Sequence, residues 1–572
     1  SQTAATCNHP NTRRTYLDSW ASFTAFCLPL HNSGTMMSFQ NMLKDGYKHL
    51  SGLEEAVLKN IEACKALSHI TRTSLGPHGM NKLVINHLDK LMITSDAATV
   101  LTEMEVQHPA AKLLVLAAKT QEAELGDGTN LVVSLAGELL GNAEELIREG
   151  LHPSEIVEGY QKAVNKVLEI LPELALPGTE KLDMRNAEDV ARALRGPLAA
   201  KQYGYEHLLA PLVAQACIEV CPANPKNFNV DNVRVSKLIG GSVNKSTVVD
   251  GLILRRDTEG TIKSVTDAKV VVYGQAVDTA ATETKGTVLI ENAEQLESYS
   301  RSEEDKMEEY IKGIADAGAK VVVGNGAFGE MAMHFIERYG LMAIKIPSKF
   351  ELRRFCRATG AVALVKNDPP SADDLGFVKG INVEEVGGSV VTIIKQDIKV
   401  GKIATVLIRG STDNMMDDME RAVDDGVNSF KAYTRDARLL PSAGAVEMEL
   451  SHRLYDFGRK QTGLDQYAIA KFALSLEVVT RMLAENAGLN AENVLPVQRA
   501  AHAAGNTSAG LDIEDGTAKD VAADTGCYDS YEVKYWALKL AADAAITVLR
   551  VDQIIMAKQA GGPKTRTPGE DD

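Results

Sequence analysis

Residues 123–131 of this 572-residue chain read Ala-Glu-Leu-Gly-Asp-Gly-Thr-Asn-Leu, and they lie where one apolar helical pattern stops and another begins. Gly126 and Gly128 allow backbone angles and close approaches that other residues resist. The Thr-Asn pair that follows leads a helix whose free N–H groups favour an anion. Asp127 would repel a phosphate there unless a cation such as Mg²⁺ lay between them. The stretch is therefore typical of a metal–phosphate site, although a glycine turn that only caps a helix could have the same sequence.

Apolar periodicity predicts long helices on both sides of this stretch. One helix is expected over Pro109 to Glu124 and the next over Asn130 to Arg148. Earlier in the chain, apolar residues recur at three- and four-residue steps from Leu53 to Leu67, and this pattern ends at Gly76-Pro77. A short hairpin follows, formed by KLVI and KLMI around NHLD. We therefore expect the N-terminal part of the chain to be mostly helical.

The middle of the chain has a different pattern. From Val230 to Gly388, helical segments alternate with the strand-like segments KVVVYG, TVLI, KVVVG, MAIKI and AVALV. After Arg409 helical patterns return and continue through residues 535–555. Similar helical layers at both ends of the chain suggest one discontinuous domain with an α/β domain inserted into it. The predicted fold class is a multidomain combination of α and α/β structure.

Composition excludes several classes of function. The chain has 61 basic and 77 acidic residues, a formal net charge of -16, whereas a general nucleic-acid binder needs clustered Lys and Arg. Its 7 cysteines are scattered without paired Cys-x-x-Cys sites, which favours a reduced, cytoplasmic protein over a zinc or disulfide framework. No run of about 18 apolar residues predicts a membrane span. We expect a cytoplasmic protein that binds neither nucleic acid nor membrane.

Both ends of the chain have little periodic pattern. Residues 1–36 contain ASFTAFCLPL, whose apolar part is too short and interrupted for a good signal peptide. We expect a disordered extension there. Residues 559–572, rich in Gly, Pro and charge, are predicted to form a disordered tail.

Two further junctions carry residues suited to a ligand. TSLGPHGMNK, at 73–82, ends a helix and exposes backbone donors as a phosphate or base cradle would require, although Gly-Pro is also an ordinary helix terminator. Asp96, in ITSDAATVL, follows a strand and begins a helix, where an N-cap is the plain explanation. Neither junction is decisive alone.

A competing motif lies in the α/β region. Gly324-x-Gly326-x-x-Gly329 follows a predicted strand and precedes a helix, as in a dinucleotide fingerprint, and Glu351 lies at a suitable distance beyond it. An NAD-dependent oxidoreductase built around residues 321–351 is therefore an alternative. GGSVNKST, by contrast, lacks the glycine before its lysine that a Walker A motif requires.

The motifs, taken in order, are similar to the signature segments of group II chaperonins. They extend from about residue 40 to 560 and comprise TSLGPHGMNK, ITSDAATVL, ELGDGTN, GGSVNKSTVVDG, RGSTDNMMDDMERAVDDG, PSAGAVE, AENAGLN, AGLDIEDG and VLRVDQII. Their order and spacing make the resemblance specific. It implies the chaperonin fold: a mostly helical, discontinuous equatorial domain, a small intermediate domain and an inserted α/β apical domain. Residues 281–312 would belong to the helical protrusion that forms a lid.

The resemblance also implies domain boundaries. The expected ranges are 37–153 and 439–558 for the equatorial domain, 154–235 and 391–438 for the intermediate domain, and 236–390 for the apical domain.

Position by position, the resemblance implies a site for ATP and Mg²⁺. Asp127 matches the magnesium ligand. Asp96 matches the acid that handles the attacking water, and Asp425 matches an intermediate-domain aspartate that swings over the nucleotide. Phosphoryl transfer depends mainly on positioning and charge neutralisation, which suits such a set. The expected nucleotide-binding residues are Leu75, Gly76, Gly128, Thr129, Asn130, Lys201 (a γ-phosphate sensor), Gly444, Asp529 and Lys534.

Several positions depart from the family pattern. Ser95 and Ala97 flank Asp96 where relatives often have Asn and Gly, and His78 replaces a basic residue. PSAG, at 441–444, replaces a triple-glycine run, and RGPLAA precedes Lys201 where Thr and Ser are usual. We expect nucleotide binding. Because extra Cβ atoms restrict backbone approach to a phosphate, hydrolysis below the full family rate is an alternative.

The implied function is that of an ATP-dependent molecular chaperone subunit, an ATP hydrolase. Such a subunit binds unfolded proteins and encloses them in a double-ring chamber whose lid closes on ATP hydrolysis. The expected partners are seven paralogous subunits in a hetero-oligomeric double ring of 16 chains, together with non-native protein substrates. Two alternatives remain: the NAD-dependent oxidoreductase, and a ring scaffold subunit with a slow or inactive ATPase site.

Overall fold

The structure is a computed structural model, and it describes residues 53–86, 89, 91–179, 183–278, 292–366, 368–396 and 403–555. The predicted extension at 1–36, the predicted tail at 559–572, the strand-like segment TVLI and residues 281–291 of the predicted lid lie outside the described residues.

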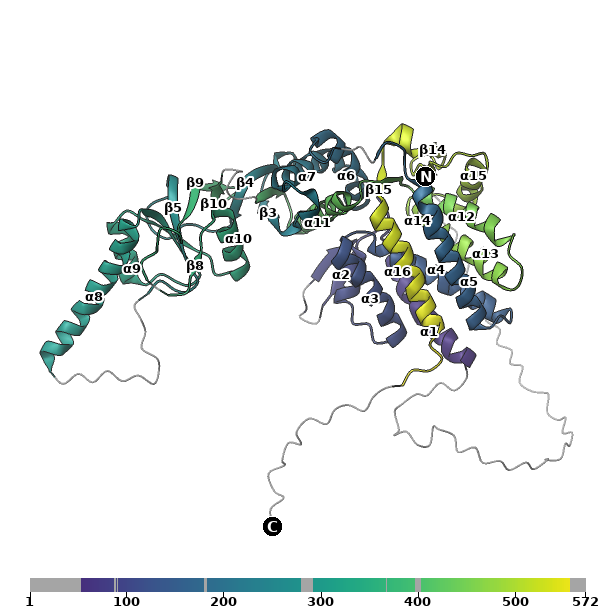
Figure 1. The fold of residues 1–572 in the computed structure, drawn as a ribbon, viewed down its shortest axis with the longest axis horizontal. Coiled ribbons are helices and arrows are strands. Elements are labelled where there is room, and N and C mark those ends of the chain that lie inside the picture. Colours follow the sequence, from purple (N-terminus) through teal and green to yellow (C-terminus); the bar gives the residue numbers. More distant parts are fainter. Residues whose placement is uncertain are drawn as a thin grey trace, which may run out of the picture. The chain divides into compact units, whose positions relative to one another are not determined.

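Long helices from the N-terminal part of the chain form the first layer, as the periodicity predicted. They are α1 (Leu53–Arg72), α3 (Pro109–Leu125), α4 (Thr129–Arg148) and α5 (Pro153–Ile170). Helix α4 packs against α1 and also against α16 (Tyr531–Leu549) from the far end of the sequence (Figure 1). Because α4 contacts neighbours on several sides, most of its side chains are buried. The predicted bounds of α3 and α4 are each confirmed to within one residue.

Helices from the C-terminal part complete this core. They are α12 (Ala445–Gly458), α13 (Asp465–Leu476), α14 (Val478–Asn486) and α15 (Ala491–Ala503). The largest hydrophobic cluster combines buried side chains from Val57 to Leu174 with others from Leu440 to Leu549. Two distant parts of the sequence therefore share one core, as their similar patterns predicted.

A second core joins two other separated segments. It is built from α6 (Ala187–Lys201), α7 (Glu206–Val220), β3 (Val233–Ile239), β11 (Ala404–Gly410) and α11 (Asp413–Arg435). Strand β11 pairs in parallel with β3, and α11 crosses both α6 and α7. Helix α5 packs in the first core, whereas the buried residues of the second core begin at Val190 in α6.

The inserted segment contributes most of a mixed sheet. In the described residues its strand order is β3, β11, β4 (Thr247–Leu254), β10 (Ser389–Lys395), β9 (Gly376–Val386), β5 (Ser264–Tyr273), β6 (Ala319–Gly324) and β7 (Met342–Lys345), with β8 (Ala363–Leu364) beside β5.

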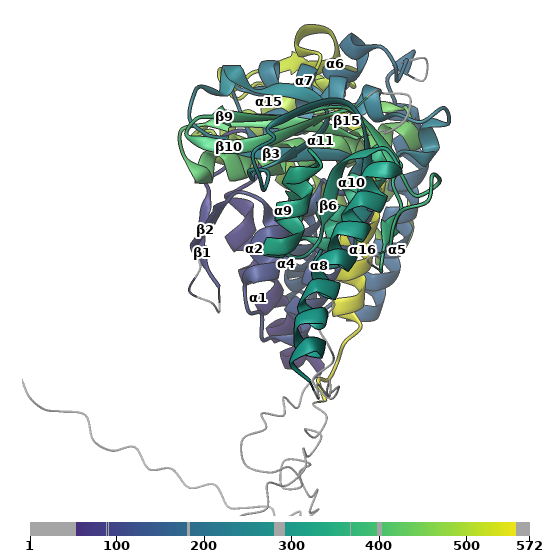
Figure 2. The same cartoon turned by 90° about the vertical axis from the view of Figure 1, so that its left-hand side faces the viewer.

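Helices cover both faces of this sheet. Because side chains alternate along a strand, Val270 and Val272 of β5 pack in the cluster that includes α10 (Lys349–Thr359). Val271 packs instead with α8 (Ala293–Asp316) and α9 (Glu330–Arg338). Figure 2 shows α9 and α10 on either side of β6. The α/β character predicted for this region is confirmed.

Short elements connect the first core to its loops. They are β1 (Lys82–Ile85), β2 (Leu91–Thr94), α2 (Ala97–Glu103), β12 (Leu439–Pro441), β13 (Ala509–Leu511), β14 (Ala518–Asp520) and β15 (Tyr528–Ser530). Strands β1 and β2 pair antiparallel and form the predicted hairpin. Among the described residues, no helix combines the length and apolar character that crossing a membrane requires.

Candidate functional site

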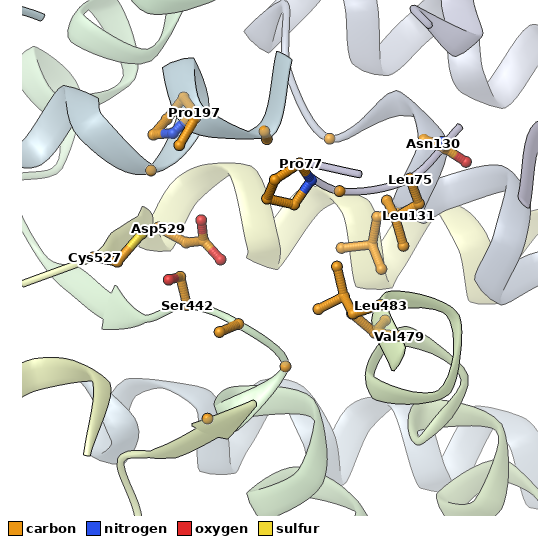
Figure 3. A pocket seen from close by; sticks show the side chains of 18 of the residues that line it. Leu75, Pro77, Asn130, Leu131, Pro197, Ser442, Val479, Leu483, Cys527 and Asp529 are labelled. Atoms are coloured by element: carbon orange, nitrogen blue, oxygen red, sulfur yellow. The ribbon is translucent and has the colours of Figure 1, made fainter. Parts of the chain in front are cut away.

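A cavity of about 490 Å³ opens between loops of the first core and the end of α6. Its walls come from residues that are far apart in the sequence: 74–77, 127–131, 196–201, 442–444, 510–514 and 527–534 contribute most of them. Figure 3 shows the apolar side chains of Leu131, Val479 and Leu483 on one side of this cavity, and the polar groups of Ser442 and Asp529 on another.

Two helix N-termini line the cavity. Gly128 precedes α4 and Gly444 precedes α12, and both have left-handed backbones, with φ of 79° and 78°. Neither helix has a side-chain hydrogen bond capping its first turn. The first N–H groups of a helix need partners from outside it, and the positive end of the helix dipole favours an anion. The arrangement predicted from AELGDGTNL, a helix start after a glycine turn, is present.

Asp127 lies between the two glycines and lines the cavity. Its Oδ1 accepts a hydrogen bond of 2.6 Å from the Gly128 N–H, and its carbonyl accepts one of 2.9 Å from Gln121 Nε2. Burial raises the pKa of Asp127, and Lys201 opposes this shift. Gly126 permits a close packing contact, because a Cβ there would lie 2.1 Å from Nδ2 of Asn428 on α11.

Lys201, the last residue of α6, brings the two predicted catalytic acids together. Its Nζ lies 2.8 Å from Asp96 Oδ1 and 3.0 Å from Asp425 Oδ2. Burial alone would lower the pKa of Lys201, but the charges of Asp425 and Asp96 outweigh it and raise the pKa. One ammonium group therefore connects α6 with α2 and α11.

Asp96 is also the N-cap of α2. Its Oδ2 accepts hydrogen bonds from the Thr99 N–H at 2.9 Å and from the Thr99 hydroxyl at 2.7 Å. Burial favours the neutral acid, but Lys201 and Thr99 outweigh burial and hold the pKa of Asp96 at about 2. The plain interpretation of Asp96 as a cap is thus correct, and the same side chain faces Lys201 with its other oxygen.

Asp425 has the opposite electrostatic character. It lies in the middle of α11 and is 8% exposed. Burial raises its pKa well above the usual range; Lys201 opposes this shift, whereas Asp127 and Asp96 add to it. Two carboxylates on one lysine thus differ strongly in basicity.

A second buried lysine lies beside the cavity. Lys534, in the first turn of α16, pairs with Glu447 of α12 and lies 3.1 Å from Asp529 Oδ2. Burial raises the pKa of Asp529 and Lys534 opposes this shift, whereas the pKa of Lys534 itself is raised because both carboxylates outweigh its burial.

The apolar wall is held by backbone contacts of the loop after α1. Asn486 Nδ2 donates to the Leu75 carbonyl at 2.8 Å. Gly76 has φ of 84°, and a Cβ there would lie 2.5 Å from Leu483 Cδ2. The side chain of Asn130 supports the same loop, because its Nδ2 donates to the Thr71 carbonyl at 3.1 Å.

Most predicted site residues meet at this cavity. Those that line it are Leu75, Gly76, Asp127, Gly128, Thr129, Asn130, Lys201, Gly444, Asp529 and Lys534. Asp96 and Asp425 contact it through Lys201. Sequence reasoning missed Glu447, although it lies within the segment PSAGAVE, and also Tyr203 and Ser530, which line the cavity without any motif to mark them.

The competing glycine motif does not form a comparable cradle. The N–H of Gly329 donates to the Val277 carbonyl at 3.0 Å, and that of Asn325 to the Tyr273 carbonyl at 3.0 Å. A Cβ on Gly326 would lie 2.6 Å from Ala276. The space that these glycines leave open is filled by the neighbouring chain segment around Ala276. A dinucleotide could therefore not approach the backbone there as the motif suggested.

Comparisons with known proteins show the family of this chain. T-complex protein 1 subunit theta of Arabidopsis thaliana is 59% identical over 525 residues, which cover 92% of this chain and 95% of that protein. The proteins of the same name from Gallus gallus and Homo sapiens are 52% and 51% identical over 528 residues, covering 92% of this chain and 96% of each relative. The sequence variants Asp-Ala-Ala-Thr and Gly-Asp-Gly-Thr-Asn, with TETKGTVLI and STDNMMDD, also resemble the theta subunit most among the subunits of the eukaryotic cytosolic chaperonin. Residues 67–559 match the TCP-1/cpn60 chaperonin family, so this chain belongs to that family.

Proposed function

We propose that this chain is an ATP-hydrolysing chaperonin subunit and that the cavity described above binds ATP with Mg²⁺. The observation that carries the proposal is the convergence of Asp127, the uncapped N-terminus of α4 and the pair of acids on Lys201 at one cavity. Such a set suits phosphoryl transfer, because that reaction needs charge neutralisation and positioning more than covalent chemistry.

The cavity has the two environments that a nucleotide requires. Apolar side chains on one wall suit a base, and the amides at the N-termini of α4 and α12 suit phosphates. Glycine suits both helix starts, since an added Cβ would strain their left-handed backbones and would lie 3.0 Å from Val533 Cγ1 at Gly128 and 2.4 Å from Thr480 Oγ1 at Gly444.

Asp127 is the residue that would hold the metal. Its carboxylate lies beside the free amides of α4, and carboxylate oxygen is a ligand that Mg²⁺ prefers. A bound magnesium ion would neutralise phosphate charge and orient the terminal phosphoryl group.

The two acids on Lys201 would divide the remaining work. Asp96, with its low pKa, is a weak base that can orient water and hold the ammonium of Lys201. Asp425, whose pKa is raised by burial, is the stronger base of the two when it is ionised. Because Asp425 lies on α11, in the second core, movement of that helix would couple hydrolysis to closure.

The proposed setting is a cytoplasmic hetero-oligomeric double ring of 16 chains with seven paralogous subunits. Within it the inserted α/β part would bind non-native proteins, and ATP hydrolysis would close the lid over them. Neither nucleic acid nor membrane is a proposed partner. Family membership, and relatives named as subunits of T-complex protein 1, support this proposal.

A slow or inactive site within the same ring is the second candidate, and one observation favours it. Ala443 lines the cavity with a left-handed backbone, φ 56°, where the family usually has glycine. Its Cβ strains the backbone beside the proposed phosphate site.

The deciding experiment is ATP hydrolysis by the purified assembly carrying Asp425→Asn in this subunit alone. If the subunit hydrolyses ATP, the rate falls by its share while bound nucleotide is retained. The exposed Asp413→Asn, on the same helix, is the matched control and should leave the rate unchanged. An unchanged rate with Asp425→Asn would assign the subunit to the scaffold class. If the unsubstituted subunit binds no nucleotide, the proposed ATP site is refuted.

A further inference from the structure

Three charged residues from three elements form a cluster beside the cavity. Glu447 lies in the first turn of α12, Lys534 in the first turn of α16, and Asp529 on β15. The ammonium of Lys534 contacts Glu447 Oε1 and lies 3.1 Å from Asp529 Oδ2. A single ammonium therefore holds two carboxylates, and through them it connects the starts of two helices to the strand.

The cluster is closed to solvent on the side of Glu447. Glu447 is 1% exposed and Lys534 is 8% exposed. Glu447 does not line the cavity, whereas Lys534 and Asp529 do. Within the described part of the chain, Glu447 Oε2 has no hydrogen-bond partner. Glu447 can therefore reach a ligand only through Lys534.

Charge at this corner of the cavity favours a hydrogen-bond donor. Two carboxylates share one ammonium, so the cluster keeps one unit of negative charge. Asp529 presents its carboxylate to the cavity (Figure 3). Ser530, 3% exposed, adds a hydroxyl whose oxygen has no partner among the described residues. A hydroxyl-bearing group suits such a corner, whereas a phosphate would be repelled.

We propose that Glu447 is a positioning residue: it draws Lys534 away from Asp529, so that Asp529 remains a strong acceptor for the sugar hydroxyls of the nucleotide. This inference rests on the proposed function, since it assigns the sugar end of the same cavity. Without the charge of Glu447, the ammonium of Lys534 has Asp529 as its remaining carboxylate partner in this cluster. A tighter pair would weaken Asp529 as an acceptor and withdraw its second oxygen from the cavity.

The test compares ATP with 2′,3′-dideoxy-ATP, which lacks both sugar hydroxyls. Binding of each is measured by equilibrium titration of the full-length chain within its purified assembly, for the unsubstituted chain and for Glu447→Gln. A hydrogen bond to a charged group is worth about tenfold in affinity, so the unsubstituted chain should prefer ATP by at least that factor. Glu447→Gln should remove most of that preference while leaving affinity for the dideoxy analogue within about twofold.

Two variants separate this role from a merely structural one. Glu449→Gln, on the same helix, removes a buried carboxylate that pairs with Arg453 and His502 outside the cavity; it should lower stability but keep the preference for ATP. Asp529→Asn should abolish the preference. If Glu447→Gln keeps the full preference, the positioning role is refuted and the ATP site stands. If the unsubstituted chain binds neither nucleotide, both proposals are refuted.

Discussion

The Nζ atom of Lys201 lies 3.0 Å from Oδ2 of Asp425, which joins the last residue of α6 to the middle of α11. The same ammonium reaches Asp96, at the start of α2 in the first core. The two cores thus share this ionic contact beside the cavity. Removing the charge of Lys201, Asp96 or Asp425 should therefore alter both the cavity and the connection between the cores.

Replacing Lys201 with Met should destabilise the protein and abolish hydrolysis. The substitution leaves Asp96 and Asp425 without their shared ammonium, and breaking a mostly buried pair costs about 3 kcal/mol. We expect a lower unfolding midpoint in thermal denaturation and loss of ATPase activity. Lys237→Met is the control, because Lys237 also holds two acids of α11, Asp417 and Glu420, but lies outside the cavity. It should lower stability and spare activity; equal loss of activity in both variants would contradict a direct role for Lys201.

Acid sensitivity should depend on Asp96. Its folded-state pKa, about 2, lies below the ordinary value of 3.8, so its ionised form stabilises the fold above about pH 4. That contribution, about 2 kcal/mol, is lost as the pH falls from 4 toward 2. The difference in unfolding free energy between the unsubstituted chain and Asp96→Asn should therefore shrink over this window. Denaturant titrations at pH 5, 4 and 3 measure it, and a difference that stays constant with pH would contradict the ion pair.

Local pattern predicted much of the fold because each signal concerns neighbouring residues. Apolar periodicity located α3 and α4, and the glycines around Asp127 located the start of α4 at the cavity. The pairing of Lys201 with Asp96 joins residues 105 apart, and no spacing rule predicts such a contact. The resemblance to a family indicated Lys201, Asp96 and Asp425 as site residues. The structure shows that Lys201 contacts both acids.

The residues that sequence reasoning missed are of this long-range kind. Glu447 contacts Lys534, which lies 87 positions further along the chain. In the sequence Glu447 is only an acidic residue in the first turn of a helix, a position that the helix dipole favours in any protein. The GNGAFG loop suggested a dinucleotide site because a sequence does not show which group fills the space beside a glycine. Glycines that permit close approach look alike whether the approaching group is a dinucleotide or, as here, the chain around Ala276.

Gly128→Ala should lower both the stability of the fold and the affinity for nucleotide. The loss of affinity should be larger than a loss of stability alone would cause. Gly128 has φ of 79°, and an added Cβ would lie 3.0 Å from Val533 Cγ1 and 3.2 Å from Gln121 Nε2. Strain and crowding together should cost about 2 kcal/mol and displace the first amides of α4. Gly150→Ala is the matched control: its φ is 100°, nothing lies within 4 Å of the added Cβ, and it does not line the cavity.

Calorimetric unfolding and nucleotide titration of both glycine variants decide between strain alone and a role at the site. Gly150→Ala should cost about 1 kcal/mol through backbone strain and leave nucleotide affinity unchanged. If the two variants lost affinity equally, the N-terminus of α4 would not be a phosphate site.

Ala443→Gly should stabilise the protein and strengthen nucleotide binding. Ala443 has a left-handed backbone, φ 56°, which costs an L-residue about 1–2 kcal/mol. Glycine removes that strain, and its greater freedom in the unfolded chain offsets about 0.5–1 kcal/mol of the gain. A net gain of about 0.5–1 kcal/mol should appear as a higher unfolding midpoint. Removal of the Cβ also opens the backbone beside Gly444, so KM for ATP should fall several-fold, about threefold for 0.6 kcal/mol.

Ala445→Gly, two residues further on, is the opposing control for that substitution. Ala445 is fully buried at the first position of α12, where glycine lowers helix stability by about 1 kcal/mol. Each variant removes one alanine methyl group, at positions two residues apart. If the unfolding midpoint rises for Ala443→Gly and falls for Ala445→Gly, the difference is due to the backbone strain at Ala443. A lower midpoint for Ala443→Gly would show that the left-handed backbone is not strained. A higher midpoint with unchanged KM would place the strain outside the nucleotide's reach, and the slow-site alternative would then lose the one observation that favours it.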